Sequence, residues 1–430
     1  MKRKTYNIAI AGLGNIGSYL FNYLIKNKKF ISNKNNTNFN LRYVSAKNKN
    51  KKRNIKVKKK QWISNYLDLT EKEDVDIIIE LIGGAEGPAK KLVFSALKNK
   101  KHVVTANKAL IAKYGDQLSY IAEKNNVNLE YEAAVCGGVP IIRSIKEGLI
   151  ANKIIKIHGI FNGTSNYVLS CMTKENISLK DAVQKAINLG YAESSPKSDL
   201  NGDDVAAKVK ILSCLSFNSF INTNIHTEGI KEIESEDLTN ADKLGYKIKL
   251  LGFSEILNNK IYQRVHPTLV NNTSYISKVN GVLNAVIIDG KPIGKNVIQG
   301  EGAGPSATTS ALISDISSVL RGNIKYPFAI SNSKRKKFKS GKINNLFFSS
   351  YIRLNVIDKY GVLSDITKVF SNNKVSIKRV LQNPHKFKRN SSIVIITHRS
   401  KDGHIQKTLK TLAKKSYIIQ KPKLLRIENG

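Results

Sequence analysis

The stretch YNIAIAGLGNIGSYLFNYLIK, residues 6–26, decides the fold of the first part of this chain. Its first six residues form the apolar run of a buried parallel strand, and helical periodicity follows the glycines. Gly12 suits a tight turn, Gly14 lets a pyrophosphate approach the backbone, and Gly17 lets the helix pack on the strand. This context predicts a Rossmann-type domain that holds a dinucleotide at the helix N-terminus. The cofactor loop is Gly12, Leu13, Gly14, Asn15, Ile16 and Gly17.

The segment after the second predicted strand bears on the choice of cofactor. The strand candidate LRYVSA, residues 41–46, leads into Lys47 and a basic run, and no Asp or Glu occurs before Asp68. An NAD site places an acidic residue here to hold the ribose 2′-hydroxyl, whereas a cation suits a 2′-phosphate. Lys47 therefore favours NADP(H) over NAD(H), although a lysine-rich chain places lysines at many positions by composition alone.

Further strands alternate with helical patterns, which predicts an α/β nucleotide-binding domain over residues 1–140. The strand candidates are DVDIIIELIGG (74–84), KHVVTAN (101–107) and VNLEYEAAV (127–135). Ligands bind beyond the carboxyl ends of such strands. The residues expected to face the cofactor are Gly83, Gly84, Thr105, Asn107 and Lys108.

The strict alternation stops near residue 140, and two further domains are expected. Residues 141–330 show the mixed pattern of an α+β substrate domain, and a polar linker over 331–348 follows. Residues 349–430 have the order βαββαβ, which resembles an ACT domain, a regulatory module for small ligands. Its first turn contains Asp358 and Gly361, with Tyr360 where such domains usually carry proline.

The segment GYAESSPKSDLNGDDVAAK, residues 190–208, gathers carboxylates in a chain whose formal net charge is +39. If a helix starts near Asp203, Asp204 and Lys208 fall at i and i+4 on one face. A lysine held by a carboxylate, beside acids that can bind an ammonium group, suits an amino-acid substrate. Taken alone, the same pattern also fits an ordinary helix after a loop, with one surface ion pair.

The amino-acid composition limits which kinds of partner and which cellular compartment we expect for this protein. The 71 Lys and Arg against 32 Asp and Glu raise nucleic acid as a partner, yet no zinc-finger, RNP or basic-zipper pattern occurs. We therefore expect no nucleic-acid function. Three widely separated cysteines argue against disulfides and zinc and favour the cytoplasm. Without an apolar run near the length of a membrane span, we expect a soluble protein and no membrane partner.

Several motifs together resemble homoserine dehydrogenase with a C-terminal ACT domain, and they cover nearly the whole chain. They are GLGNIG, IIIELIGGAEGPA, VVTANKALIA, YEAAVCGGVPII, FNGTSNYVL, GYAESSPKSDLNGDDVAAK, EGI, LGYKIKLLG, RVHPTLV and GEGAG. The resemblance implies reversible, NAD(P)H-dependent interconversion of L-aspartate 4-semialdehyde and L-homoserine. Such an enzyme serves the biosynthesis of threonine, methionine and isoleucine.

The resemblance also implies roles for individual residues. Lys208 matches the family's acid/base lysine and Lys108 its companion; Asp204 falls on a position that lines the amino-acid pocket, and its place one helical turn earlier would let it hold Lys208. The other positions that line the amino-acid pocket are Glu193, Asp199, Tyr191, Gly163 and Thr164. Gly304 matches a position near the cofactor, and Lys108 one between nicotinamide and substrate. Backbone groups of a family sodium loop match Glu132, Val135, Gly137 and Val139, although a tight turn explains the CGGVP glycines as well.

The chemistry requires a proton donor to the alkoxide that develops as hydride reaches the aldehyde. Burial and a neighbouring cationic lysine or oxidised nicotinamide are expected to lower the pKa of Lys208, with Asp204 partly countering that shift. Ser195 departs from the family pattern, where an aspartate is usual, but no proton transfer rests on it.

The third domain implies regulation. The resemblance makes threonine the expected effector, near Asp358, Gly361 and Gln382, and makes a homodimer or homotetramer the expected assembly. Two alternatives remain open at this point: a different NADP-dependent amino-acid oxidoreductase on the same scaffold, and a catalytically silent amino-acid sensor. The joint presence of both lysines and the acidic pocket disfavours the sensor.

Overall fold

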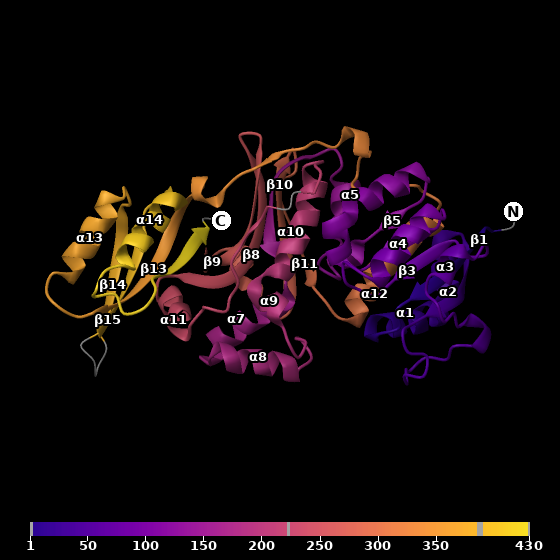
Figure 1. The fold of residues 1–430 in the computed structure, drawn as a ribbon, viewed down its shortest axis with the longest axis horizontal. Helices are drawn as coiled ribbons and strands as arrows, with labels where there is room; N and C mark the ends of the chain where they lie inside the picture. Colours follow the sequence, from indigo (N-terminus) through magenta and orange to yellow (C-terminus); the bar gives the residue numbers. More distant parts are fainter. Residues whose placement is uncertain (1–2, 222–223, 385–389, 429–430) are drawn as a thin grey trace.

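The computed structural model describes residues 3–221, 224–384 and 390–428. Three parts lie in a row along the long axis of the molecule (Figure 1). The nucleotide-binding region is at one end, the mixed α+β region is in the middle, and the C-terminal region is at the other end. The predicted fold class is confirmed in all three parts.

The first part is built on a parallel sheet with the strand order β2-β1-β3-β4-β5. Apolar strands with helices on either side bury both faces of this sheet, as a parallel sheet requires. The elements are β1 (Thr5–Ala11), α1 (Asn15–Lys26), α2 (Lys28–Asn35), β2 (Asn38–Ser45), α3 (Asp68–Glu71), β3 (Ile77–Glu80), α4 (Pro88–Lys98), β4 (His102–Thr105), α5 (Lys108–Lys124) and β5 (Leu129–Glu130).

The strand expected over 127–135 is shorter than predicted. β5 ends at Glu130, and a 3-10 turn over Glu132–Ala134 follows. The side chain of Glu132 accepts hydrogen bonds from the amides of Ile142 and Arg143, at 2.8 and 2.7 Å. These bonds tie the chain to the next helix, so the apolar pattern continues while the strand does not.

The middle part places its helices against a large mixed sheet. Its elements are α6 (Ile141–Arg143), β6 (Lys153–Ile160), α7 (Gly163–Glu175), α8 (Leu179–Asn188), α9 (Lys197–Asn201), α10 (Asp203–Ser216), β7 (His226–Thr227), α11 (Ser235–Lys243), β8 (Tyr246–Leu257), β9 (Lys260–Asn271), β10 (Leu283–Lys291), β11 (Gly294–Glu301) and α12 (Pro305–Leu320). Helix α10 packs on β8 and β9 through Val205, Val209 and Leu212, which are buried.

Helix α12 leaves the middle part and returns to the first. Leu312, Ile316 and Val319 share one buried cluster with Ile8 and Ile10 of β1. The helix after the GEGAG motif therefore packs against the sheet of the first domain. A core that joins residues about three hundred positions apart fixes the nucleotide-binding domain to the middle domain.

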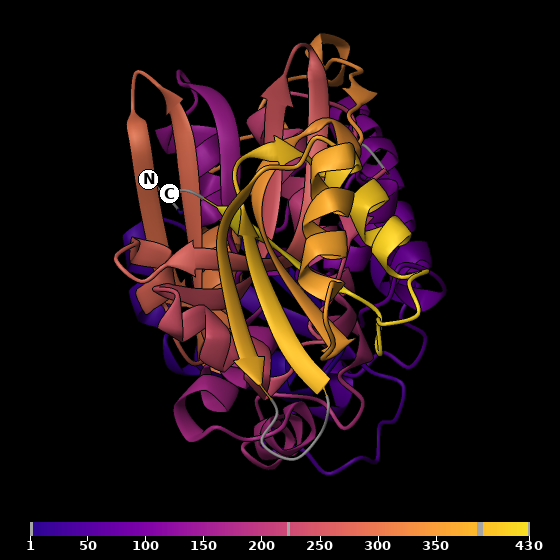
Figure 2. The same cartoon turned by 90° about the vertical axis from the view of Figure 1, so that its left-hand side faces the viewer.

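The C-terminal part shows the predicted βαββαβ order with one short extra strand. Its elements are β13 (Phe347–Ile357), α13 (Val362–Asn372), β14 (Ile377–Pro384), β15 (Asn390–Thr397), β16 (Ser400–Lys401), α14 (Asp402–Leu412) and β17 (Lys423–Glu428). In Figure 2, which looks onto this part, the strands and the two helices (orange and yellow) lie in front of the rest of the molecule.

The C-terminal strands continue the sheet of the middle part. β17 pairs in parallel with β9, at Arg426 opposite Thr268, and the strand order is β11-β10-β6-β8-β9-β17-β13-β15-β14. The sequence pattern did not predict this connection. The C-terminal domain is therefore joined to the middle domain by backbone hydrogen bonds as well as by side chains.

The segment predicted as a linker is packed rather than free. Arg335 is fully buried, and its guanidinium lies 2.5 Å from Asp116 of α5 and donates to the carbonyl of Ser219. A two-residue strand, β12 (Lys339–Ser340), pairs with β9. Within the described part of the chain, no helix is both long and apolar enough to cross a membrane.

Candidate active site

The glycines of the loop between β1 and α1 fit a dinucleotide. A Cβ on Gly12 would lie 2.4 Å from the carbonyl oxygen of Leu81, and one on Gly17 would lie 2.0 Å from that of Gly12. These two positions admit no side chain. A Cβ on Gly14 would meet nothing within 4 Å, so its backbone borders open space at the N-terminus of α1. Bare backbone at a helix N-terminus is what a pyrophosphate needs.

Glu80 organises the neighbouring strand ends, and the sequence pattern did not single it out. One carboxylate oxygen accepts from the amides of Ile82 and Gly83, at 2.8 and 2.9 Å, and the other accepts from the hydroxyl of Thr105 at 2.6 Å. Thr105 is fully buried. The hydroxyl of Thr105 therefore holds Glu80, which shapes the loop, and the contact of Thr105 with the cofactor stays a prediction. A lone carboxylate ending the run IIIE was the available signal.

The basic segment after β2 contributes a second cation near the glycine loop. Lys47 is exposed at the end of this strand, as predicted. Arg53 was missed; its guanidinium donates to the carbonyls of Leu13 and Asn48, at 2.9 and 2.8 Å. Arg53 therefore fixes the segment that carries Lys47 against the cofactor loop.

The predicted lysine pair converges on one carboxylate. Asp204 is buried at the start of α10, and its two oxygens lie 2.8 Å from Lys208 Nζ and 2.8 Å from Lys108 Nζ. Lys208 Nζ also donates to the carbonyl of Phe161 at 2.6 Å. The i,i+4 spacing brings Lys208 to Asp204, and the start of α5 brings Lys108 from the nucleotide domain. The site therefore straddles the two domains.

Asn162 joins two carboxylates that are close in space. Its amide nitrogen donates to Asp199 at 2.7 Å and to Asp204 at 2.8 Å. Its amide oxygen caps α7 by accepting from the Ser165 amide at 2.7 Å. The motif FNGTSN contained the signal, because an Asn between a strand and a helix is a typical N-cap. Sequence reasoning had named its neighbours Gly163 and Thr164 instead.

The electrostatics of the lysine pair differ from the prediction. Burial tends to lower the pKa of Lys208, but the adjacent Asp204 carboxylate, together with Cys136 and Asp199, raises it, and the net shift is upward. Burial tends to raise the pKa of Asp204, yet Lys208 and Lys108 hold it well below its usual range. In the chain by itself the pKa of Lys208 is therefore raised, not lowered as expected, because the neighbouring acidic groups together exceed the effect of burial.

The remaining predicted pocket residues lie around the N-terminus of α7. Burial raises the pKa of Asp199, with Asn162 opposing that shift. The hydroxyl of Thr164 donates to the carbonyl of Tyr191 at 2.8 Å, which joins α7 to the acidic segment. Glu193 is exposed on this segment, and within residues 3–221, 224–384 and 390–428 it makes no hydrogen bond or ion pair. The structure thus gathers Asp199, Asp204 and Lys208 but leaves Glu193 at the surface.

The loop matched to a sodium site turns sharply. Cys136 and Gly137 have positive φ angles of 59° and 46°. The carbonyls of Glu132 and Val139 accept backbone hydrogen bonds from Val135 and Ile141, at 3.2 and 2.7 Å. Burial raises the pKa of the Glu132 carboxyl to about 7. Carbonyl oxygens suit a hard cation and each has a second lone pair, so the donor set fits sodium chemically.

Comparison with known proteins gives one consistent family. The chain matches three family models: the homoserine dehydrogenase NAD-binding domain at residues 12–132, homoserine dehydrogenase at 140–317, and the ACT domain at 350–416. Homoserine dehydrogenase from Helicobacter pylori is 36% identical over 432 residues, which cover 99% of this chain and 100% of that protein. The enzyme from Bacillus subtilis is 33% identical over 95% of each chain.

Solved structures agree with these relatives. A homoserine dehydrogenase from Thiobacillus denitrificans matches with a TM-score of 0.92 and 33% identity over 99% of both chains. The Staphylococcus aureus enzyme gives a TM-score of 0.78 and 30% identity over 100% of both chains. A hyperthermophilic archaeal homoserine dehydrogenase in complex with NADPH matches 75% of this chain and 100% of its own, with a TM-score of 0.64 and 25% identity.

Proposed function

The chain belongs to the homoserine dehydrogenase family, and on that premise we propose how its own residues carry the reaction. The activity is the reversible, NAD(P)-dependent interconversion of L-aspartate 4-semialdehyde and L-homoserine. The observation that carries the proposal is the buried Asp204 carboxylate shared by Lys208 and Lys108. A nicotinamide cofactor, when bound, supplies or accepts the hydride.

Lys208 is the proton carrier in this proposal. Its ammonium group is cationic at neutral pH, since burial does not bring its pKa below the ordinary value of a lysine, so it can donate a proton to the alkoxide oxygen during reduction. In homoserine oxidation the same group must be neutral to accept the hydroxyl proton. Asp204 and the carbonyl of Phe161 fix the direction of Nζ, and Lys108 holds the other oxygen of Asp204.

The amino-acid part of the substrate is assigned to the surroundings of α7. Asp199 and Glu193 can take the substrate ammonium, and a cation beside Asp199 would stabilise its charged form, which burial disfavours. The amides of Gly163 and Thr164, in the first turn of α7, can take the carboxylate. Tyr191 lies on the same segment and is joined to Thr164.

The cofactor is proposed to be NADP(H) in preference to NAD(H). The backbone at Gly14 and at Gly304 borders open space, since a Cβ at either position would meet nothing within 4 Å. Gly14 belongs to the glycine loop Gly12 to Gly17. Lys47, placed by Arg53, is the cation assigned to a 2′-phosphate. Sodium is proposed at the backbone of Glu132, Val135, Gly137 and Val139, and replacing sodium by choline in the assay tests that site.

The C-terminal domain, proposed over 349–430, is assigned to feedback control by threonine. Asp358 and Gly361 form the exposed turn before α13, where Gly361 has a φ of 83°, and Gln382 is exposed on β14. We further propose that the protein forms a homodimer or homotetramer and has no nucleic-acid partner. We also propose that it resides in the cytoplasm, where its three free, buried cysteines stay reduced. Light scattering of the eluted protein tests the assembly.

One assay tests the core of this proposal. NADPH formation from NADP⁺ and L-homoserine is followed with and without threonine, in the full-length chain and in Asp358→Ala. Turnover of L-homoserine, with inhibition by threonine that weakens in the variant, is expected. Turnover with unchanged rates at every threonine concentration contradicts the regulatory part alone.

A further inference from the structure

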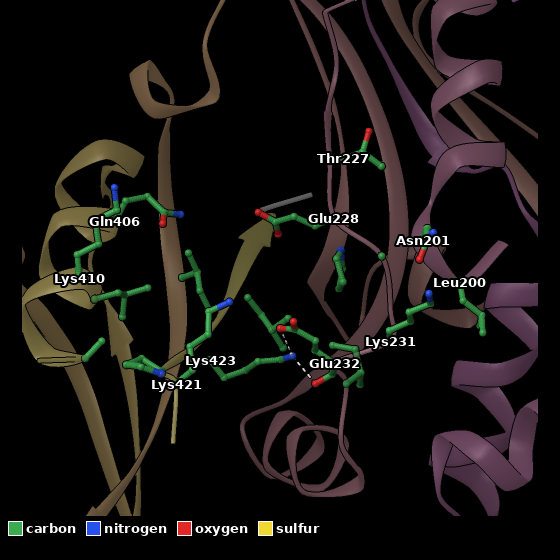
Figure 3. A pocket seen from close by; sticks show the side chains of 18 of the residues that line it. Leu200, Asn201, Thr227, Glu228, Lys231, Glu232, Gln406, Lys410, Lys421 and Lys423 are labelled. Atoms are coloured by element: carbon green, nitrogen blue, oxygen red, sulfur yellow. Dashed lines mark hydrogen bonds and ion pairs between the residues drawn. The ribbon is translucent and has the colours of Figure 1, made fainter. Parts of the chain in front are cut away.

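A cavity of about 740 Å³ lies between the C-terminal domain and the segment that leads into α10 (Figure 3). Gln406 and Lys410 of α14, with Lys421 and Lys423, form one wall. Asn201 and Lys231 belong to the other wall, from the middle domain. The residues assigned above to substrate, cofactor and effector are not among those that line it.

The lysines of the cavity outnumber the carboxylates that could neutralise them. Within the described part of the chain, Lys231, Lys410 and Lys421 have no hydrogen bond or ion pair, and all three are exposed at the cavity. Lys423 donates to the carbonyl of Glu232, and its Nζ lies 3.6 Å from that residue's carboxylate. Both walls of the cavity therefore carry lysine side chains with a positive charge.

The carboxylates of the cavity are Asp203, Glu228 and Glu232, and of these Glu228 is already engaged. Arg426 of β17 binds both of its oxygens, at 3.0 and 2.9 Å, and His226 lies 2.7 Å away. Burial opposes ionisation of Glu228, but His226 and Arg426 hold its pKa well below the usual range. Glu228 thus has little capacity left to balance the lysines, and a bound anion would relieve their mutual repulsion.

The motif EGI, residues 228–230, connects this cavity to the active-site helix. A Cβ on Gly229 would lie 2.0 Å from the carbonyl oxygen of Leu200, so only glycine fits. The amide of Ile230 donates to that same carbonyl at 2.8 Å. Leu200 and Asn201 end α9, and α10 with Asp204 and Lys208 begins two residues later. A ligand bound between the two walls would therefore lie against the turn at Leu200–Gly202, which positions α10.

We propose that this cavity binds a small, multiply charged phosphorylated metabolite and that occupancy changes substrate binding through the turn at Leu200–Gly202. Lysines are effective phosphate binders as point charges, and several of them around one cavity suit a ligand with more than one negative charge. The apolar part of the lining, which includes Leu409 and Pro422, gives room for a carbon skeleton.

Inorganic pyrophosphate is the probe, titrated by calorimetry into the full-length protein saturated with NADP⁺, so that the cofactor site is filled. Lys410→Ala/Lys421→Ala removes two charges from one wall, and Lys231→Ala removes one from the other. Lys407→Ala/Lys414→Ala is the matched control, because both lysines are exposed on or just after α14 and do not line the cavity. All four proteins are expected to oxidise homoserine at similar basal rates.

The double cavity variant is expected to bind pyrophosphate about tenfold to thirtyfold more weakly, the control within about twofold of the parent, and Lys231→Ala between them. The KM for homoserine should change with pyrophosphate in the parent and control, but not in the double cavity variant. No binding by the parent, or equal affinity in all four proteins, overturns the proposal. Homoserine oxidation itself is unaffected by either result, so the enzymatic assignment is tested separately.

Discussion

Lys208 Nζ lies 2.8 Å from Asp204 Oδ2, and both side chains are buried. The other oxygen of Asp204 lies equally close to Lys108, whose side chain is 42% exposed. One carboxylate therefore fixes two cations that differ in their access to solvent. The buried one is Lys208. Asp204 and the Phe161 carbonyl fix the position of its Nζ, as the position of a proton carrier must be fixed.

Replacing Lys208 by alanine is expected to remove the proton carrier. Turnover should fall by at least the factor of about 10²–10⁴ that general acid–base catalysis supplies, while NADPH still binds with unchanged affinity. Steady-state kinetics and NADPH fluorescence measure the two effects. Lys210→Ala is the control, since Lys210 lies on another face of α10 and makes no contact with Asp204. Normal turnover of Lys208→Ala contradicts the assignment.

Asp204→Asn should shift the pH dependence of homoserine oxidation. Asp204 raises the pKa of Lys208, whereas burial lowers it. With the carboxylate gone, the lysine loses its proton at a lower pH, so the rising limb of the kcat profile moves toward acid. The maximal rate also falls, because Nζ loses a fixed partner. An unmoved limb, measured in buffers of constant ionic strength, means that Lys208 is not the group that titrates.

Asn162→Ala should weaken homoserine binding and lower stability together. It removes the donor shared by Asp199 and Asp204 and the N-cap of α7, at an expected cost of about 1–3 kcal/mol. Urea unfolding and KM for homoserine measure both effects. Asn162→Ser separates them, because serine can still cap the helix but cannot bridge the carboxylates. A rise in KM is expected in both variants, and the larger loss of stability in the alanine variant.

Lys47→Ala should reduce discrimination between the two cofactors. Loss of the cation assigned to the 2′-phosphate is expected to lower kcat/KM for NADPH by about tenfold while that for NADH stays the same, a change of about 1.4 kcal/mol. Lys52→Ala, on the same exposed segment, controls for a general loss of charge. If kcat/KM falls equally with both cofactors, or with neither, Lys47 does not bind the 2′-phosphate.

Arg426→Ala should undock the C-terminal domain. Arg426 is 1% exposed; it lies 2.8 Å from the equally buried Asp402 within the C-terminal domain and 2.9 Å from Glu228 of the middle domain, and breaking such a buried pairing costs about 3–5 kcal/mol. Because the pKa of Glu228 is depressed in the folded state, its share of this stability is present at neutral pH and is lost as pH falls through the folded value. Thermal unfolding of parent and variant should therefore converge on acidification. Arg42→Ala, at an exposed ion pair, should change unfolding far less.

Local sequence patterns predicted the features that depend on neighbours in the chain. The strand–turn–helix around Gly12 and Gly17 follows from spacing, because those glycines are required within one turn. The contact between Asp204 and Lys208 follows from helical periodicity in the same way. The bridge from Asn162 to Asp199 was not predicted, because it joins segments that only the packing of α7 beside α9 brings together.

The sequence by itself therefore determined the order of the domains, the glycine loop and the pairing within α10, since periodicity and residue type act over a few positions. Tertiary structure decided the rest. It placed Lys108 on Asp204, returned α12 to the first core, and joined β17 to β9. It also reversed the expected pKa shift of Lys208, because the balance between burial and an ion pair depends on distances that no linear pattern specifies.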